Sequence, residues 1–252
     1  MKAIGVYISL LLVVLLLTSS GCKLGNQNKA TTPAVNDDSL VSMVKEKIEE
    51  KKRIQEYKES RMSREFLAKT EEYFPVIKKY SKRYGLDWRL IIAQIMKESR
   101  FKENAVSHMG ARGLMQIMPY TAVEITRELD YEYIFRDPQE NITAGIYHLY
   151  KQMSYFTDAD YENRMKLALA SYNAGPGRVF DAQDIAAVVS GKRNDWQYVR
   201  AGLAHLTSKD WKLHLEVWEL GVPPNGYFYG SEETIDYVDD IFKTYKILQK
   251  LR

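Results

Sequence analysis

The chain has 252 residues, of which 45% are hydrophobic and 27% are charged. This composition is typical of a globular protein, excludes a wholly disordered chain, and suffices for one well-cored domain with an appendage. The 36 basic residues exceed the 33 acidic ones by only three and are spread along the chain, which argues against a nucleic-acid partner. The single cysteine excludes a disulfide framework, and the four histidines lack metalloenzyme spacing, so we expect no metal and no cofactor.

The first 22 residues have the pattern of a secretory signal peptide. A basic residue precedes an apolar run from Ala3 to Leu17, and small residues then lead to Cys22. The run is shorter than the roughly 20 apolar residues that span a membrane. This segment resembles the lipobox of bacterial lipoproteins, which implies that Cys22 becomes the lipidated N-terminus. The alternative is an ordinary signal with an incidental cysteine, since Ser19 stands where the lipobox usually has leucine.

Residues 23–70 are expected to form a polar linker followed by a charged helix. Residues 23–44 are rich in Asn, Thr and Ser and have little periodicity, which is typical of a flexible tether. Between Lys45 and Glu65 there are eight basic and six acidic residues. This stretch predicts a solvated helix held by ion pairs four residues apart, with a partner-binding coiled coil as the alternative.

Residues 71–252 predict an all-α domain, because apolar residues recur at helical spacing and strand signals are scarce. Local signals also place several helix boundaries. They are the N-cap Asp87 for residues 88–99, Pro119 for residues 119–129, a capping box of Asp137 and Glu140 for residues 141–153, and Ser231 for the last helix.

Glu98 is the candidate catalytic residue of the helix predicted over residues 88–99. Apolar residues from Trp88 to Met96 form one buried stripe, and Glu98 continues the edge of that stripe. It also lies in the last turn, where the helix dipole disfavours an added anion. Partial burial and the dipole both raise the carboxyl pKa, which suits a general acid. From this feature alone, a solvated glutamate at a helix end is the simpler interpretation.

Several separated blocks resemble the lytic transglycosylases that have a soluble-lytic-transglycosylase-type catalytic domain. The blocks are Glu98-Ser99, residues 110–119, Asn141 to Gly145, residues 171–179 and residues 233–238. Together they cover about residues 71–245. The resemblance implies a lysozyme-like α-helical domain that cleaves the β-1,4 bond between N-acetylmuramic acid and N-acetylglucosamine without water and forms 1,6-anhydro-N-acetylmuramic acid ends.

The resemblance also implies roles for individual residues. Glu98 would be the single catalytic group, acting first as acid and then as base. The residues expected to bind the glycan strand are Ser107, Gln116, Met118, Tyr172, Asn173 and Tyr237. We expect Gln116 and Tyr172 to contact sugar rather than fill the core, and Tyr237 to approach Glu98. Three residues depart from the family pattern: Ser171 replaces the usual alanine, His148 stands where many members have tyrosine, and Tyr229 stands where related sequences often have arginine.

Two other functions remain open. A hydrolase of the goose-lysozyme type would need a second carboxylate, for which Glu103, Glu124 and Asp181 are available. A wall-binding lipoprotein could keep the binding residues without catalysis. In each case the expected partners are peptidoglycan strands and, through the N-terminal lipid, a membrane. Lys23 follows the cysteine, in place of the Asp that often retains lipoproteins at the inner membrane. We therefore expect the periplasmic face of the outer membrane, with the inner membrane as the alternative.

Overall fold

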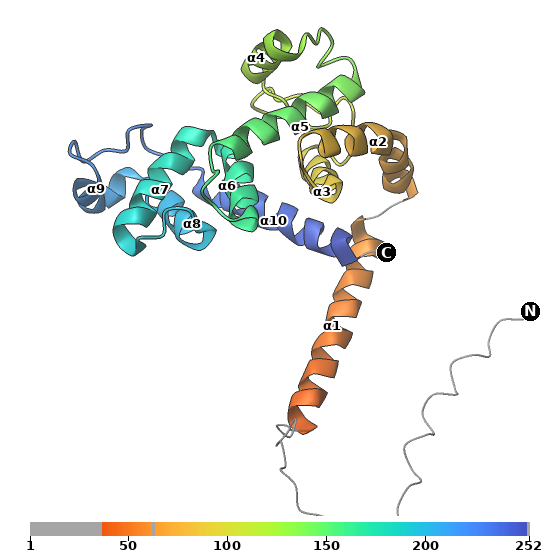
Figure 1. Ribbon diagram of the computed structural model, residues 1–252, viewed down its shortest axis with the longest axis horizontal. Coiled ribbons are helices and arrows are strands. Elements are labelled where there is room, and N and C mark those ends of the chain that lie inside the picture. The colour runs from red at the N-terminus through yellow and green to blue at the C-terminus, as the bar shows by residue number, and fades with distance from the viewer. Residues whose placement is uncertain (1–36, 62–63, 251–252) are drawn as a thin grey trace, which may run out of the picture. The chain divides into compact units, whose positions relative to one another are not determined.

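The computed structural model describes residues 37–61 and 64–250 of the chain. Within these ranges there are ten α-helices, one 3-10 turn and no strand, so the predicted all-α class is confirmed (Figure 1). The elements are α1 Asp37–Arg61, α2 Arg64–Arg83, α3 Trp88–Glu98, α4 Pro119–Leu129, α5 Pro138–Ser154, α6 Tyr161–Ala174, α7 Pro176–Ser190, α8 Trp196–Ala204, η1 Ser208–Asp210, α9 Trp211–Val217 and α10 Ser231–Lys250. The predicted signal peptide and Cys22 lie outside the described residues, so both stay predictions.

The chain divides into two units, residues 1–49 and residues 50–252. In the first unit the described residues belong to α1, and its side chains from Val41 to Glu49 are exposed. Further along α1, Lys52 pairs with Glu56 at 3.9 Å, as predicted for a solvated charged helix. The helix begins at Asp37 rather than at residue 45, because weak periodicity argues against a buried face and not against an exposed helix. In the described ranges, no helix has the length and apolar composition to cross a bilayer.

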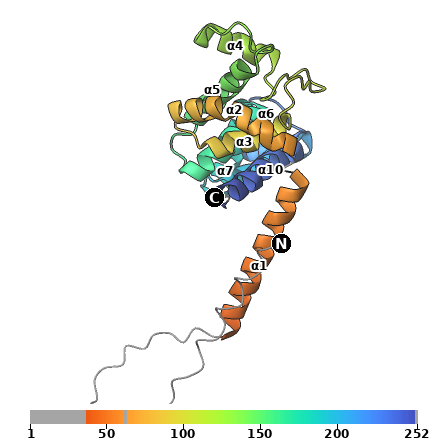
Figure 2. The ribbon, with the colours of Figure 1, turned by 90° about the vertical axis from the view of Figure 1, so that its right-hand side faces the viewer.

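Helix α3 belongs to the second unit and carries Glu98 as its last residue. It packs against α2 on one side and α10 on another (Figures 1 and 2). Every residue from Leu90 to Met96 is buried. The predicted single stripe was therefore too narrow, because α3 is enclosed on nearly all of its faces. Burial of each large aliphatic side chain here stabilises the fold by about 1.5–3 kcal/mol.

Polar contacts fix α3 against α10 at both ends. Asp87 accepts a hydrogen bond from the backbone N–H of Arg89 at 2.9 Å, which confirms it as the N-cap. Its second carboxylate oxygen accepts from the hydroxyl of Tyr245 on α10 at 3.1 Å. At the other end of α3, Lys97, which directly precedes Glu98, pairs with Asp240 at 2.6 Å. Because α10 also packs on α6 and α8, it positions α3 relative to both helices.

The start of α5 shows one difference from the predicted capping box. Asp137 is the N-cap and accepts from the N–H of Gln139 at 2.7 Å, as expected. Glu140, however, accepts from the N–H of Tyr133 at 2.7 Å instead of bonding back to Asp137. The reason is that the Asp137 N–H already donates to the Tyr133 carbonyl at 2.7 Å. The two acids thus tie the preceding loop to the helix.

Candidate active site

Glu98 is held by a short hydrogen bond from a residue 139 positions further along the chain. The hydroxyl of Tyr237 on α10 donates to Glu98 Oε1 at 2.5 Å. Glu98 is half-buried, and the protein atoms packed around its carboxyl raise its pKa to about 8. The Tyr237 hydrogen bond and the Lys97 charge lower this pKa, but desolvation outweighs them. At neutral pH the carboxyl therefore keeps its proton.

The backbone turns sharply directly after Glu98. Arg100 and Phe101 have φ values of 52° and 60°, a left-handed conformation that costs L-residues about 1–2 kcal/mol each. Phe101 is 4% exposed, so its ring anchors the turn in the core. This turn ends α3 and leads the chain into the loop of residues 102–118, which carries Ser107 and Gln116.

A buried amide supports Tyr237 from inside α3. Gln94 is fully buried, and its Nε2 donates to the Tyr237 hydroxyl oxygen at 3.1 Å. Gln94, Tyr237 and Glu98 thus form a continuous chain of two hydrogen bonds. The sequence prediction missed Gln94, because it lies off the apolar stripe and nothing local indicates that this side of the helix is buried.

Asn141 of α5 fixes the loop before α4. Its Oδ1 accepts from the Met115 N–H at 2.9 Å. Its Nδ2 donates to the carbonyls of Arg112 at 3.1 Å and Ile134 at 3.0 Å. Gly113 has a φ of 83°, and a Cβ there would stand 2.4 Å from the Asn141 side chain. The block from Asn141 to Gly145, which the sequence marked without a role, thus shapes this loop.

Ser107 and Gln116 also use their side chains within the same loop. Ser107 Oγ accepts from the Ala111 N–H at 3.0 Å. Gln116 Nε2 donates to the carbonyls of Ala105 at 3.1 Å and Gly113 at 2.8 Å. Both amide hydrogens of Gln116 are therefore engaged, and only its amide oxygen can accept from a ligand. Contact of these two residues with sugar remains a prediction.

Tyr172 of α6 joins this loop to the surroundings of Glu98. Its hydroxyl donates to the Met115 carbonyl at 2.8 Å. Burial raises the pKa of Tyr172, and the charge of Glu98 raises it further, which places the two groups close together. The ring of His148 meets the Tyr172 ring edge-on, with 4.8 Å between the ring centroids. Burial lowers the pKa of His148 to about 4, so His148 is a neutral packing partner at neutral pH.

The two remaining predicted binding residues, Asn173 and Met118, are both exposed. Asn173 is exposed and accepts through its Oδ1 from the hydroxyl of Thr234 at 2.7 Å, which joins α6 to α10. Met118 precedes α4 and is 40% exposed, so its side chain is not core filler. Tyr229, which departs from the family pattern, is 68% exposed and donates to Ser208 Oγ at 3.0 Å.

Two of the three spare carboxylates are engaged by other side chains. Glu103 pairs with Lys69 at 2.5 Å and accepts from the Tyr73 hydroxyl at 2.8 Å, and the bond to Lys69 lowers the pKa of Glu103. Asp181 is 1% exposed and accepts from the side chain of Asn225 at 2.8 Å. Asp181 thereby anchors the loop before α10. Glu124 on α4 is half-buried.

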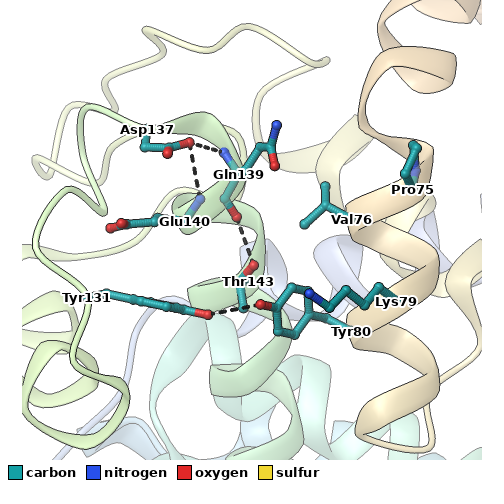
Figure 3. Close-up of a pocket in the computed structure, with 9 residues that line it drawn as sticks. All are labelled: Pro75, Val76, Lys79, Tyr80, Tyr131, Asp137, Gln139, Glu140 and Thr143. Atoms are coloured by element: carbon teal, nitrogen blue, oxygen red, sulfur yellow. Dashed lines mark hydrogen bonds between the residues drawn. The ribbon is translucent and has the colours of Figure 1, made fainter.

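A pocket of about 370 Å³ lies between α2 and the start of α5 (Figure 3). Its lining residues are Pro75, Val76, Lys79, Tyr80, Tyr131, Asp137, Gln139, Glu140 and Thr143. With 3.6 residues per turn, Gln139 and Thr143 share one face of α5, whereas Asn141, Gly145 and His148 share the opposite face. The pocket is therefore separate from the side of α5 that meets the Met115 loop. Across the residues described, no three His, Cys, Asp or Glu side chains group to hold a metal ion.

The family model that matches this chain and two curated relatives are all transglycosylases. Residues 75–194 match the family model described as transglycosylase SLT domain. A membrane-bound lytic murein transglycosylase F from Desulfosudis oleivorans is 37% identical over 179 residues, which are 70% of this chain and 36% of that protein. Its namesake from Histophilus somni strain 129Pt is 32% identical over 173 residues, or 68% of this chain and 32% of that protein. The chain thus spans about a third of the length of these curated relatives.

Among solved structures, the lytic transglycosylase Slt of Pseudomonas aeruginosa is 28% identical with a TM-score of 0.44, covering 71% of this chain and 24% of that one. The family match confirms the resemblance predicted from the sequence blocks.

Proposed function

Because residues 75–194 are a transglycosylase SLT domain, we propose that the chain is a lytic transglycosylase that cleaves peptidoglycan between N-acetylmuramic acid and N-acetylglucosamine. The observation that carries the proposal is the state of Glu98, whose pKa is raised to about 8 by burial. A carboxylic acid that is protonated at neutral pH can protonate a glycosidic oxygen. Its place as the last residue of α3, hydrogen-bonded to Tyr237 and near Tyr172, gives that proton a defined position.

In the proposed reaction one carboxyl group performs both proton transfers. Glu98 donates its proton to the glycosidic oxygen of the departing N-acetylglucosamine, and the bond from C1 to that oxygen breaks. The N-acetyl oxygen of the muramic acid residue stabilises the sugar cation. The Glu98 carboxylate then takes the proton of the C6 hydroxyl while the C6 oxygen bonds to C1. The product has a 1,6-anhydro ring, no water is consumed, and Glu98 is protonated again.

The engagement of the spare acids favours this route over hydrolysis. A retaining hydrolase places a second free carboxylate about 5 Å from the acid. Glu103 is neutralised by Lys69, and Asp181 is bound by Asn225 inside the fold. Glu124 is the remaining candidate for a second catalytic carboxylate, so substitution of Glu124 tests the hydrolytic alternative. The raised pKa of Glu98 likewise favours catalysis over glycan binding alone, because binding a neutral sugar requires no such shift.

The test is mass spectrometry of the muropeptides released from purified peptidoglycan sacculi. We expect products with anhydro ends, one water lighter than hydrolytic products. Glu98→Gln should lower the rate by at least ~10²–10⁴-fold, and the control Glu124→Gln should retain it. Mainly hydrated products, or loss of activity in Glu124→Gln, would instead support a hydrolase. Undiminished activity in Glu98→Gln would remove the proposed site.

We further propose that the enzyme works in the cell envelope, anchored by a lipid on Cys22. The relatives named membrane-bound lytic murein transglycosylase support an envelope location. Multiple acyl chains on one cysteine hold a protein firmly to a bilayer, and we place the anchor on the periplasmic face of the outer membrane. Cys22→Ser should move the protein out of the membrane fraction and abolish labelling by a fatty-acid probe. Labelling that persists would contradict the anchor.

A further inference from the structure

The buried amide of Gln94 has no evident role in stability. In the described part of the chain its Oε1 has no hydrogen-bond partner, although the side chain is fully buried. A buried acceptor without a partner destabilises a fold, and an apolar side chain of the same length would avoid that loss. Among the described residues, the side chain of Gln94 makes one hydrogen bond, from Nε2 to the Tyr237 oxygen, and the Tyr237 hydroxyl in turn donates to Glu98.

The polarity of the bond between Tyr237 and Glu98 decides where the catalytic proton lies. When the Tyr237 hydroxyl donates to Oε1, the proton of the neutral Glu98 carboxyl must be on Oε2. In the reverse polarity Glu98 donates from Oε1 to the Tyr237 oxygen, and the proton is held away from substrate. The carboxyl is a stronger acid than the phenol, so the reverse polarity is favoured unless another donor occupies the Tyr237 oxygen.

We propose that Gln94 is a positioning residue, which donates to the Tyr237 oxygen and thereby keeps the catalytic proton of Glu98 on Oε2. The N–H of Gln94 fills the acceptor site of the hydroxyl and leaves the Tyr237 proton directed at Oε1. Donor and acceptor bonds in such a chain also strengthen each other. This inference rests on the proposed transglycosylase reaction. It adds that a buried residue, Gln94, determines which carboxyl oxygen of Glu98 carries the proton.

The charged and titratable groups that act on Glu98 come from three helices. Tyr237 of α10 donates to it, Tyr172 of α6 lies near enough to feel its charge, and Lys97 of α3 acts through its ammonium. Lys97 is itself paired with Asp240. Of these groups only Tyr237 is hydrogen-bonded to Gln94. A change at Gln94 should therefore reach Glu98 through Tyr237 and leave the other groups in place.

The test uses Gln94→Met, which keeps the length of the side chain and removes the donor. With soluble, uncross-linked peptidoglycan strands as substrate, kcat should fall roughly 5- to 10-fold at unchanged KM, the equivalent of one neutral hydrogen bond. The alkaline limb of the pH profile should move upward by several tenths of a pH unit, because Tyr237 donation lowers the pKa of Glu98. Gln94→Leu, with a different shape, should give the same result.

Two comparisons separate positioning from packing. In a Tyr237→Phe background, Gln94→Met should cause no further loss of kcat, because its effect passes through the missing hydroxyl. The control Ile92→Val trims a side chain of the same helix that is 3% exposed and should lower stability without moving the pH limb. An unchanged kcat, an unmoved limb, or additive losses with Tyr237→Phe would each overturn the proposal. Wild-type products without anhydro ends would instead overturn the proposed function.

Discussion

Glu98→Gln should make the protein more stable at alkaline pH, although it removes the proposed catalytic group. The pKa of Glu98 is raised from 4.5 to about 8 in the fold, chiefly by desolvation. Below pH 4.5 the carboxyl is protonated in both the folded and the unfolded chain, so its ionisation has no effect on the free energy of unfolding. As the pH rises towards 8, only the unfolded chain releases the proton, and the wild type loses stability.

The size of the effect follows from the shift. Each pH unit between the two pKa values lowers the wild-type free energy of unfolding by about 1.4 kcal/mol. The full shift corresponds to about 4–5 kcal/mol above pH 8, and relaxation of the half-buried site makes this an upper value. Glutamine has the shape of the protonated acid and does not titrate. The stability difference between Glu98→Gln and wild type should therefore grow with pH and level off above pH 8.

Urea denaturation of both proteins at pH values from about 3 to 9 measures this difference, since the titration of all other groups cancels. Glu103→Gln is the matched control with the opposite sign. The pKa of Glu103 is lowered by Lys69, so Glu103 stabilises the fold above its unfolded pKa and loses that effect as the pH falls. A difference for Glu98→Gln that stays flat between pH 5 and 8 would refute the reasoning that burial keeps Glu98 protonated.

Three further predictions follow from the geometry. Tyr237→Phe removes a hydrogen bond that lowers the pKa of Glu98, so the alkaline limb of activity should move to higher pH, and a downward shift in pH–rate profiles would contradict this. Gly145→Ala should destabilise the protein by about 1–3 kcal/mol in urea titrations, because its Cβ would stand 2.4 Å from Met115; a helix that gains stability there would disprove the contact. Arg100→Gly should stabilise the fold by up to about 1 kcal/mol, since φ is 52° at this exposed position, and calorimetry showing a loss would speak against strain.

Helix boundaries could be predicted because their signals are local. Asp87 caps α3 and Pro119 begins α4, as expected, since a cap or a first-turn proline acts on its own helix. The partner of Glu140 could not be predicted, because it is the N–H of Tyr133 in a loop whose path depends on the rest of the fold. Likewise α1 begins earlier than expected, because an exposed helix needs no apolar pattern.

The direction of the Glu98 pKa shift could be predicted from the sequence, but the relative size of its causes could not. The sequence suggested partial burial and the helix dipole together, whereas desolvation is the first cause in the fold. The contact with Tyr237 came from family resemblance, since no local rule joins residues 139 positions apart. Gln94 was not predicted by either route. Its role depends on α10 covering a face of α3 that the sequence pattern left unassigned.

The loop of residues 102–118 shows why a sequence block that resembles a family motif does not translate directly into sugar contacts. Gln116 donates both amide hydrogens to carbonyls of the loop, and the Tyr172 hydroxyl donates to the Met115 carbonyl. These bonds fix the loop without a ligand, so the proposed binding of a glycan would cost less conformational entropy. The groups that these bonds leave unused include the Gln116 amide oxygen, the Tyr172 ring and the exposed Met118 side chain, which are proposed sugar contacts. A sequence block of this kind first determines the conformation of the loop. The atoms that the loop's own hydrogen bonds do not use are the ones that can contact a substrate.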